Sequence, residues 1–153
     1  MKYNLPLLIA AAIGAVLLVV FFFYDPSYSD AKEAKRLFES GQYEQSLVLA
    51  EAVYEKNAYN MMAHTVIEQA KRAIKYERYI KNAREYKEQI GQISAAADVD
   101  ALKIKLILET AIYEYAKLGG AGYMTPKSLV KEADEYNGEF TALYKELFEK
   151  PNR

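Results

Sequence analysis

Hydrophobic residues recur every three or four positions along most of this chain, which is the spacing of a helix with one buried face. The pattern is clearest over residues 80–97 and 129–147. Residues 101–118 differ, because they are apolar on most sides of a helix, which is typical of a central position. We therefore predict an all-α fold with long antiparallel helices.

The first 24 residues follow another pattern. No charged side chain occurs from residue 5 to residue 24, and a helix of about 20 residues spans the roughly 30 Å hydrocarbon core of a bilayer. The run is longer than the apolar part of a signal peptide, and its small residues lie in its middle, so an uncleaved anchor is favoured over a cleaved leader. We predict a transmembrane anchor at 1–24, a juxtamembrane linker at 25–30 and a helical domain at 31–150.

Basic residues do not clearly orient this anchor. Lys2 precedes it, whereas Lys32, Lys35 and Arg36 lie within the window that counts after it. The linker contains no base, and the N-terminal tail is short enough to remain in the cytoplasm. We therefore expect a periplasmic helical domain, and the absence of cysteine suits that compartment without requiring it.

Two short amphipathic segments meet at Gly41. Asp30 and Glu33 have the spacing of a helix start with a capping box, and Gly41 follows the first apolar stripe, where a left-handed glycine commonly ends a helix. The second segment keeps helical spacing from about residue 43 to residue 57. These features predict a hairpin of two helices.

The hairpin resembles one tetratricopeptide repeat (TPR), in which a Gly-x-Tyr signature joins two helices that pack over small residues. Ser46 and Val53 stand where the family often has alanine, and no second Gly-x-Tyr follows at the family period of about 34 residues. The resemblance implies a module that holds peptides or helices of other proteins. The residues that match are Ala34, Leu37, Gly41 and Tyr43.

The composition is rich in Lys, Tyr, Glu and Asn and contains no Cys and no Trp. In this composition, in its short predicted linker and in its single TPR-like hairpin, the chain looks like small inner-membrane proteins of flagellated ε-proteobacteria. That resemblance implies a single-pass protein of the bacterial inner membrane. It also implies a structural part in an oligomer or large envelope assembly such as the flagellar motor.

Few residues suit chemistry. Without cysteine and with His64 as the single histidine, the chain has no thiol nucleophile and no histidine cluster for a metal. The glycine loop at 119–122 follows a helix and lacks the Gly-Lys-Ser/Thr of a phosphate loop. We predict that the protein is not an enzyme and needs no cofactor or metal. The formal charge of −1 does not favour nucleic acid.

The most informative side chains are aromatic, since the chain has 14 Tyr and 6 Phe. Tyrosine suits both the edge of a core and a contact surface. We predict that Tyr76, Tyr79 and Tyr86 form a candidate partner interface, with core packing as the alternative. The expected function is a membrane-anchored scaffold or adaptor that docks membrane or periplasmic proteins.

An alternative function is binding to a lipid surface. It would use a basic stretch of the long helix, whose interspersed glutamates instead favour an ordinary solvated face. The basic residues are Lys71, Arg72, Lys75, Arg78 and Lys81.

Overall fold

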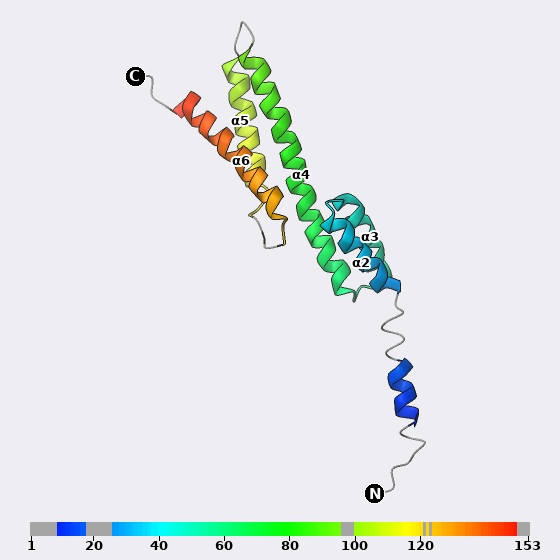
Figure 1. The fold of residues 1–153 in the computed structure, drawn as a ribbon. Helices are drawn as coiled ribbons and strands as arrows, with labels where there is room; N and C mark the ends of the chain where they lie inside the picture. Colours follow the sequence, from blue (N-terminus) through cyan, green and yellow to red (C-terminus); the bar gives the residue numbers. More distant parts are fainter. Residues whose placement is uncertain (1–8, 18–25, 96–99, 121, 123, 150–153) are drawn as a thin grey trace. The chain divides into compact units, whose positions relative to one another are not determined.

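The computed structural model describes residues 9–17, 26–95, 100–120, 122 and 124–149 (Figure 1). Helices fill most of these ranges and no β-strand occurs within them, so the all-α prediction is confirmed. After a helix at 9–17, the elements are α2 (Pro26–Glu39), α3 (Tyr43–Lys56), α4 (Met61–Ser94), α5 (Ala101–Ala116), α6 (Lys127–Tyr144) and the π-helical turn η1 (Lys145–Glu149).

The predicted transmembrane anchor is wrong. Of its residues, 9–17 form a helix of about 14 Å, half the thickness of a bilayer core, and the others lie outside the described residues. Among the helices that the structure describes, none combines the length and the apolar character needed to cross a membrane. The predicted single-pass inner-membrane location with a periplasmic domain, and the membrane contact through residues 5–24, are corrected for the same reason.

The chain divides into two compact units, residues 1–67 and residues 68–153. The first unit contains α2, α3 and the beginning of α4. The second contains the rest of α4 together with α5 and α6. Helix α4 itself is continuous over 34 residues, so Gly91 does not interrupt it.

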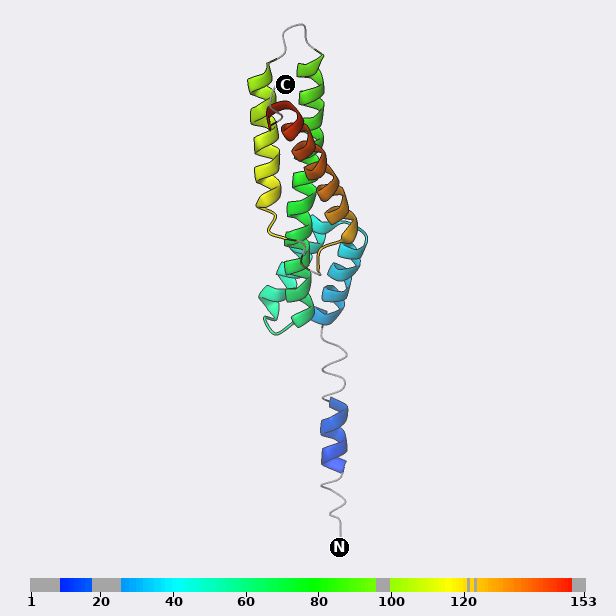
Figure 2. The ribbon, with the colours of Figure 1, turned by 90° about the vertical axis from the view of Figure 1, so that its left-hand side faces the viewer.

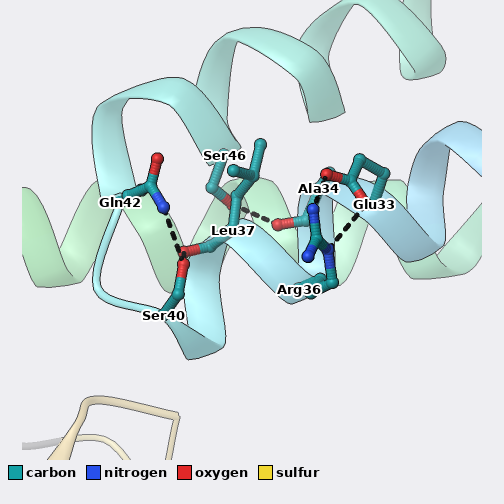
Figure 3. A network of polar contacts seen from close by, with 7 residues as sticks. All are labelled: Glu33, Ala34, Arg36, Leu37, Ser40, Gln42 and Ser46. Carbon is teal, nitrogen blue, oxygen red and sulfur yellow. Dashed lines mark hydrogen bonds and ion pairs between the residues drawn. The ribbon is translucent and has the colours of Figure 1, made fainter.

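Helix α2 begins earlier than the sequence predicts. It starts at Pro26, so most of the expected linker belongs to its first turns and Asp30 lies inside the helix. Proline suits a first turn because its missing N–H is not needed there. Glu33 does not close a capping box: its carboxylate accepts hydrogen bonds from the guanidinium of Arg36 at 2.6 and 2.8 Å (Figure 3).

The end of α2 is fixed by Gly41, whose φ of 82° confirms the predicted left-handed stop. Its N–H donates to the carbonyl of Phe38 at 3.0 Å, and the N–H of Gln42 donates to the carbonyl of Leu37 at 2.9 Å. This pair of bonds is a Schellman motif, which satisfies carbonyls that the end of a helix would otherwise leave free. The turn therefore determines where α3 begins.

Small side chains line the contact between α2 and α3. Ala34 and Ala50 are completely buried, as is Ser46. The hydroxyl of Ser46 donates to the carbonyl of Ala34 at 2.7 Å (Figure 3), so a serine at an alanine-like position adds a hydrogen bond and little bulk. Val53 and Ala63 extend this buried contact to the beginning of α4.

Asn60 connects the two ends of the first unit. Its side-chain oxygen accepts from the N–H of Ala63 at 3.0 Å, which caps the start of α4. Its amide nitrogen donates to the carbonyl of Ser27 at 3.1 Å. The first turn of α2 is thereby held against the start of α4.

In the second unit, α4, α5 and α6 lie side by side, as Figures 1 and 2 both show. Tyr115 of α5 bonds to Asp134 of α6, and Glu109 of α5 to Tyr144 of α6, so these helices are antiparallel. They surround one core. Its buried aliphatic and aromatic residues are Tyr76, Tyr79, Ile80, Ala83, Ile90, Ile104, Ile107, Leu108, Ala111, Ala133 and Phe140.

Ion pairs and caps complete this bundle. Arg84 pairs with Glu132 and Lys87 with Glu139, each at 2.6 Å, which places α6 parallel to α4. Asp100 caps α5 by accepting from the N–H of Lys103 at 3.0 Å. Helix α6 instead has Pro126 at its N-cap position without a side-chain cap bond.

The turn at Gly41 can be tested against a helical glycine. An added β-carbon would meet open space at both Gly41 and Gly91, so a change to alanine probes the backbone alone. We expect Gly41→Ala to lower the free energy of unfolding by about 1 kcal/mol, because L-residues avoid this φ. We expect Gly91→Ala to raise it by up to about 1 kcal/mol. Chemical denaturation measures both, and effects of the same sign would contradict this account of the turn.

Candidate functional site

The predicted tyrosine interface lies largely inside the second unit. Tyr76 and Tyr79 are only 4% and 3% exposed and belong to its core. Tyr86 is half-buried beside that core, and its hydroxyl donates to the carboxylate of Glu114 at 3.1 Å. Burial raises the pKa of both Tyr76 and Tyr79. These placements favour the core alternative, so a partner surface has to be sought elsewhere among the described residues.

The four TPR-like residues all serve the hairpin itself. Ala34 is buried at the helix contact, and Gly41 forms the turn. Leu37 is half-buried, and its carbonyl accepts from the hydroxyl of Ser40 at 2.9 Å (Figure 3). The same carbonyl accepts from the backbone N–H of Gln42. The ring of Tyr43 lies 5.2 Å from that of Phe38. These contacts position α2 against α3.

A polar cluster lies where α5 meets the start of α6. The hydroxyl of Tyr115 donates to Asp134 at 2.5 Å, and its ring meets the ring of Tyr79 edge-on at 5.6 Å. The bond to Asp134 and burial together raise the pKa of Tyr115 to about 12. This arrangement holds the neutral phenol in place and acts as a structural link between the two helices.

An open hollow of about 570 Å³ adjoins this cluster. Its charged side chains are of both signs, and Lys131 and Glu135 approach each other to 3.7 Å. No set of three or more histidine, cysteine, aspartate or glutamate side chains that could hold a metal ion occurs in the described part of the chain. The residues lining the hollow are Gly122, Thr125, Lys127, Val130, Lys131, Asp134 and Glu135.

His64 and the basic stretch of α4 supply no reactive group. The ring of His64 lies 5.7 Å from the ring of Tyr54 in the first unit. The basic side chains of α4 are exposed, but Glu68, Glu77 and Glu85 are exposed among them. This alternation does not favour an anionic lipid surface as the ligand.

An uncovered apolar face of α5 is the feature that the sequence did not reveal. Leu102, Leu106 and Tyr113 are 77%, 64% and 60% exposed. Their spacing of four and seven residues places them on one side of the helix. The opposite side is buried through Ile104 and Leu108. The expected central position of α5 is therefore wrong, because only part of its circumference is covered within its unit.

Charged residues flank this face in an ordered way. Lys103 and Lys105 lie in the first half of α5, and Glu109 and Glu114 lie in the second half. Lys105 and Glu109 approach each other to 3.9 Å, and both are roughly half exposed. Glu114 accepts hydrogen bonds from Asn82 and Tyr86 of α4. The order of lysines followed by glutamates is visible in the sequence, but only the structure shows that these residues border an exposed apolar stripe.

Comparison with known proteins gives no family to which the chain can be assigned. No protein-family model matches it, and no curated protein and no solved structure is significantly similar.

The core position of Tyr79 predicts a large loss on truncation. We expect Tyr79→Ala to cost about 3 to 5 kcal/mol, because a large ring leaves a cavity, whereas Tyr113→Ala on the exposed face should cost about 0.5 kcal/mol. Tyr79→Phe is the matched control: the hydroxyl of Tyr79 is buried without a hydrogen-bond partner among the described residues, so its removal should leave stability unchanged or slightly higher. Equal losses for Tyr79→Ala and Tyr113→Ala in chemical denaturation would contradict this assignment.

The raised pKa of Tyr115 predicts a pH dependence. Because the folded pKa is about 12 and the ordinary value is 10.0, the stabilisation is complete below pH 10 and is lost as pH rises towards 12. We expect the stability difference between the unsubstituted chain and Tyr115→Phe to stay constant up to about pH 9 and to disappear between about pH 10 and pH 12. Denaturant titrations across this range measure it, and a difference that persists at the upper end would show that the bond to Asp134 is not its source.

Proposed function

We propose that this chain is a non-enzymatic docking protein whose contact surface is the outer face of α5, defined by Leu102, Leu106 and Tyr113. The single observation that carries the proposal is the high exposure of these three large apolar side chains along one helix. Single exposed apolar residues are ordinary on a protein surface, but several large ones on one side of a helix are typical of an interaction site.

The stripe has the form that a partner helix recognises. Anchors separated by four and seven residues match the ridge of a helix packing along another helix. Leucine side chains can pack between the side chains of a partner helix. Tyrosine adds the large contact area of its ring and loses little side-chain conformational entropy on binding. Lys117 contributes a cation 4.2 Å from the centre of the Tyr113 ring, which holds that ring at the end of the stripe.

The remaining features support a scaffold or adaptor role. The TPR-like hairpin of the first unit resembles modules that hold other proteins. The resemblance of the composition to envelope proteins of flagellated bacteria supports a place in an oligomer or larger assembly, such as a flagellar motor. We propose protein partners and no nucleic acid, because the chain carries no basic surplus.

Site-specific photo-crosslinking in cells tests this proposal. A photoreactive phenylalanine analogue at Leu106 should give discrete protein adducts, because that side chain would lie inside the contact. The same analogue at Gln89, an exposed position of α4, is the matched control and should give few or none. Equal yields of adduct at the two positions would overturn the assignment of the docking face.

A further inference from the structure

We propose that the partner of the α5 face is the α5 face of a second copy of this chain, with the two helices antiparallel. This inference rests on the proposed function, because it names the partner of the same surface. It is carried by three observations: the spacing of the apolar residues, the order of the charges beside them, and the small net charge of the chain.

The apolar spacing is compatible with a two-fold axis. If the axis crosses α5 at the level of residues 107–108, Leu102 of one copy lies opposite Tyr113 of the other. Leu106 then lies next to the axis in both copies, so the two Leu106 side chains contact each other. An interface between identical faces has to be self-complementary in this way, and here the aliphatic side chain of Leu102 meets the ring of Tyr113 at each end.

The charge order selects the antiparallel orientation. Around a two-fold axis in the interface plane, each flank of one helix meets the same flank of the other. Lys105 then approaches Glu109 of the second copy, and by symmetry the contact occurs twice. Parallel helices would instead oppose lysine to lysine and glutamate to glutamate, which like-charge repulsion disfavours.

The overall charge does not oppose self-association. The chain has 20 basic and 21 acidic residues and a formal charge of −1, so two copies meet without strong mutual repulsion. The proposed contact extends over about three helical turns, which is smaller than a standard stable interface. We therefore expect a reversible dimer that dissociates on dilution below roughly 10 µM.

Sedimentation velocity of the purified full-length chain, from about 1 to about 200 µM, tests the inference. We expect a reversible monomer–dimer equilibrium. Leu106→Glu should weaken it by at least about tenfold, because it places a charge at the centre of the contact. Circular dichroism spectra and melting curves establish that each variant remains folded. A chain that stays monomeric throughout, or a Leu106→Glu variant that dimerises unchanged, would overturn the proposal.

Charge exchange tests the orientation. Lys105→Glu and Glu109→Lys should each weaken dimerisation several-fold, and the double variant should restore it, because the two pairs across the axis are then re-formed with reversed signs. Lys131→Glu is the matched control, since Lys131 and Glu135 form a similar pair four residues apart on α6 at 3.7 Å, and it should leave the equilibrium unchanged. A double variant as weak as the single variants would overturn the antiparallel contact.

The two proposals fail in different ways. If the purified chain is monomeric while the analogue at Leu106 still links to another protein in cells, the second copy is wrong as the partner and the docking face stands. If adducts are equally frequent at Leu106 and Gln89, the docking face itself is wrong.

Discussion

Helix α5 carries apolar residues around most of its circumference. Its two neighbours in the bundle, α4 and α6, cover only part of that circumference. This mismatch is the constraint from which the functional account follows. Ile104, Leu108 and Ala111 are buried, so the helix is firmly part of its bundle. The large apolar residues that stay exposed on α5 are Leu102, Leu106 and Tyr113. Keeping their apolar surface in water costs about 25 cal/mol per Å² of that surface. A partner that covers them removes that cost.

The exposed apolar face of α5 differs from the other contacts described in the two units. Several tyrosines in the second unit are buried in the core, such as Tyr76 and Tyr79, or bonded to carboxylates, as in Tyr86–Glu114 and Tyr115–Asp134. The first unit satisfies its own backbone through the turn at Gly41 and the serine bond to Ala34. These polar groups have partners within their own unit, whereas the three exposed apolar side chains of α5 have no cover among the residues that the structure describes, so the α5 face is the strongest candidate for an external contact.

Local signals were readable from the sequence, whereas positions that depend on neighbouring elements were not. The role of Gly41 could be predicted because a left-handed helix stop depends on only a few adjacent residues. Asp30 was misleading, because Pro26 provides an equally good start one turn earlier. The uncharged run at 5–24 has the composition of a membrane span, but its described helix covers only residues 9–17.

The exposed face of α5 was not predicted for a related reason. Residue type cannot tell an interface tyrosine from a core tyrosine, because both environments suit a ring with a polar tip. Tyr76 and Tyr79 proved to be core residues, and Tyr113, which had been read only as part of an apolar helix, proved to be exposed. The number of helices available to cover α5 is a tertiary property. In the sequence, the sign of this exposed face was that residues 101–118 are apolar on more sides than a small bundle can cover.

Hydroxyl-radical footprinting in intact cells tests the docking face most directly. The measurement compares the oxidation of Tyr113 with that of Tyr59, which is 93% exposed and lies outside the stripe, in cells and in dilute purified protein. The account predicts that Tyr113 is protected in cells relative to Tyr59 and becomes reactive on purification and dilution. Equal oxidation ratios in the two settings would show that nothing covers α5 in the cell and would contradict the account.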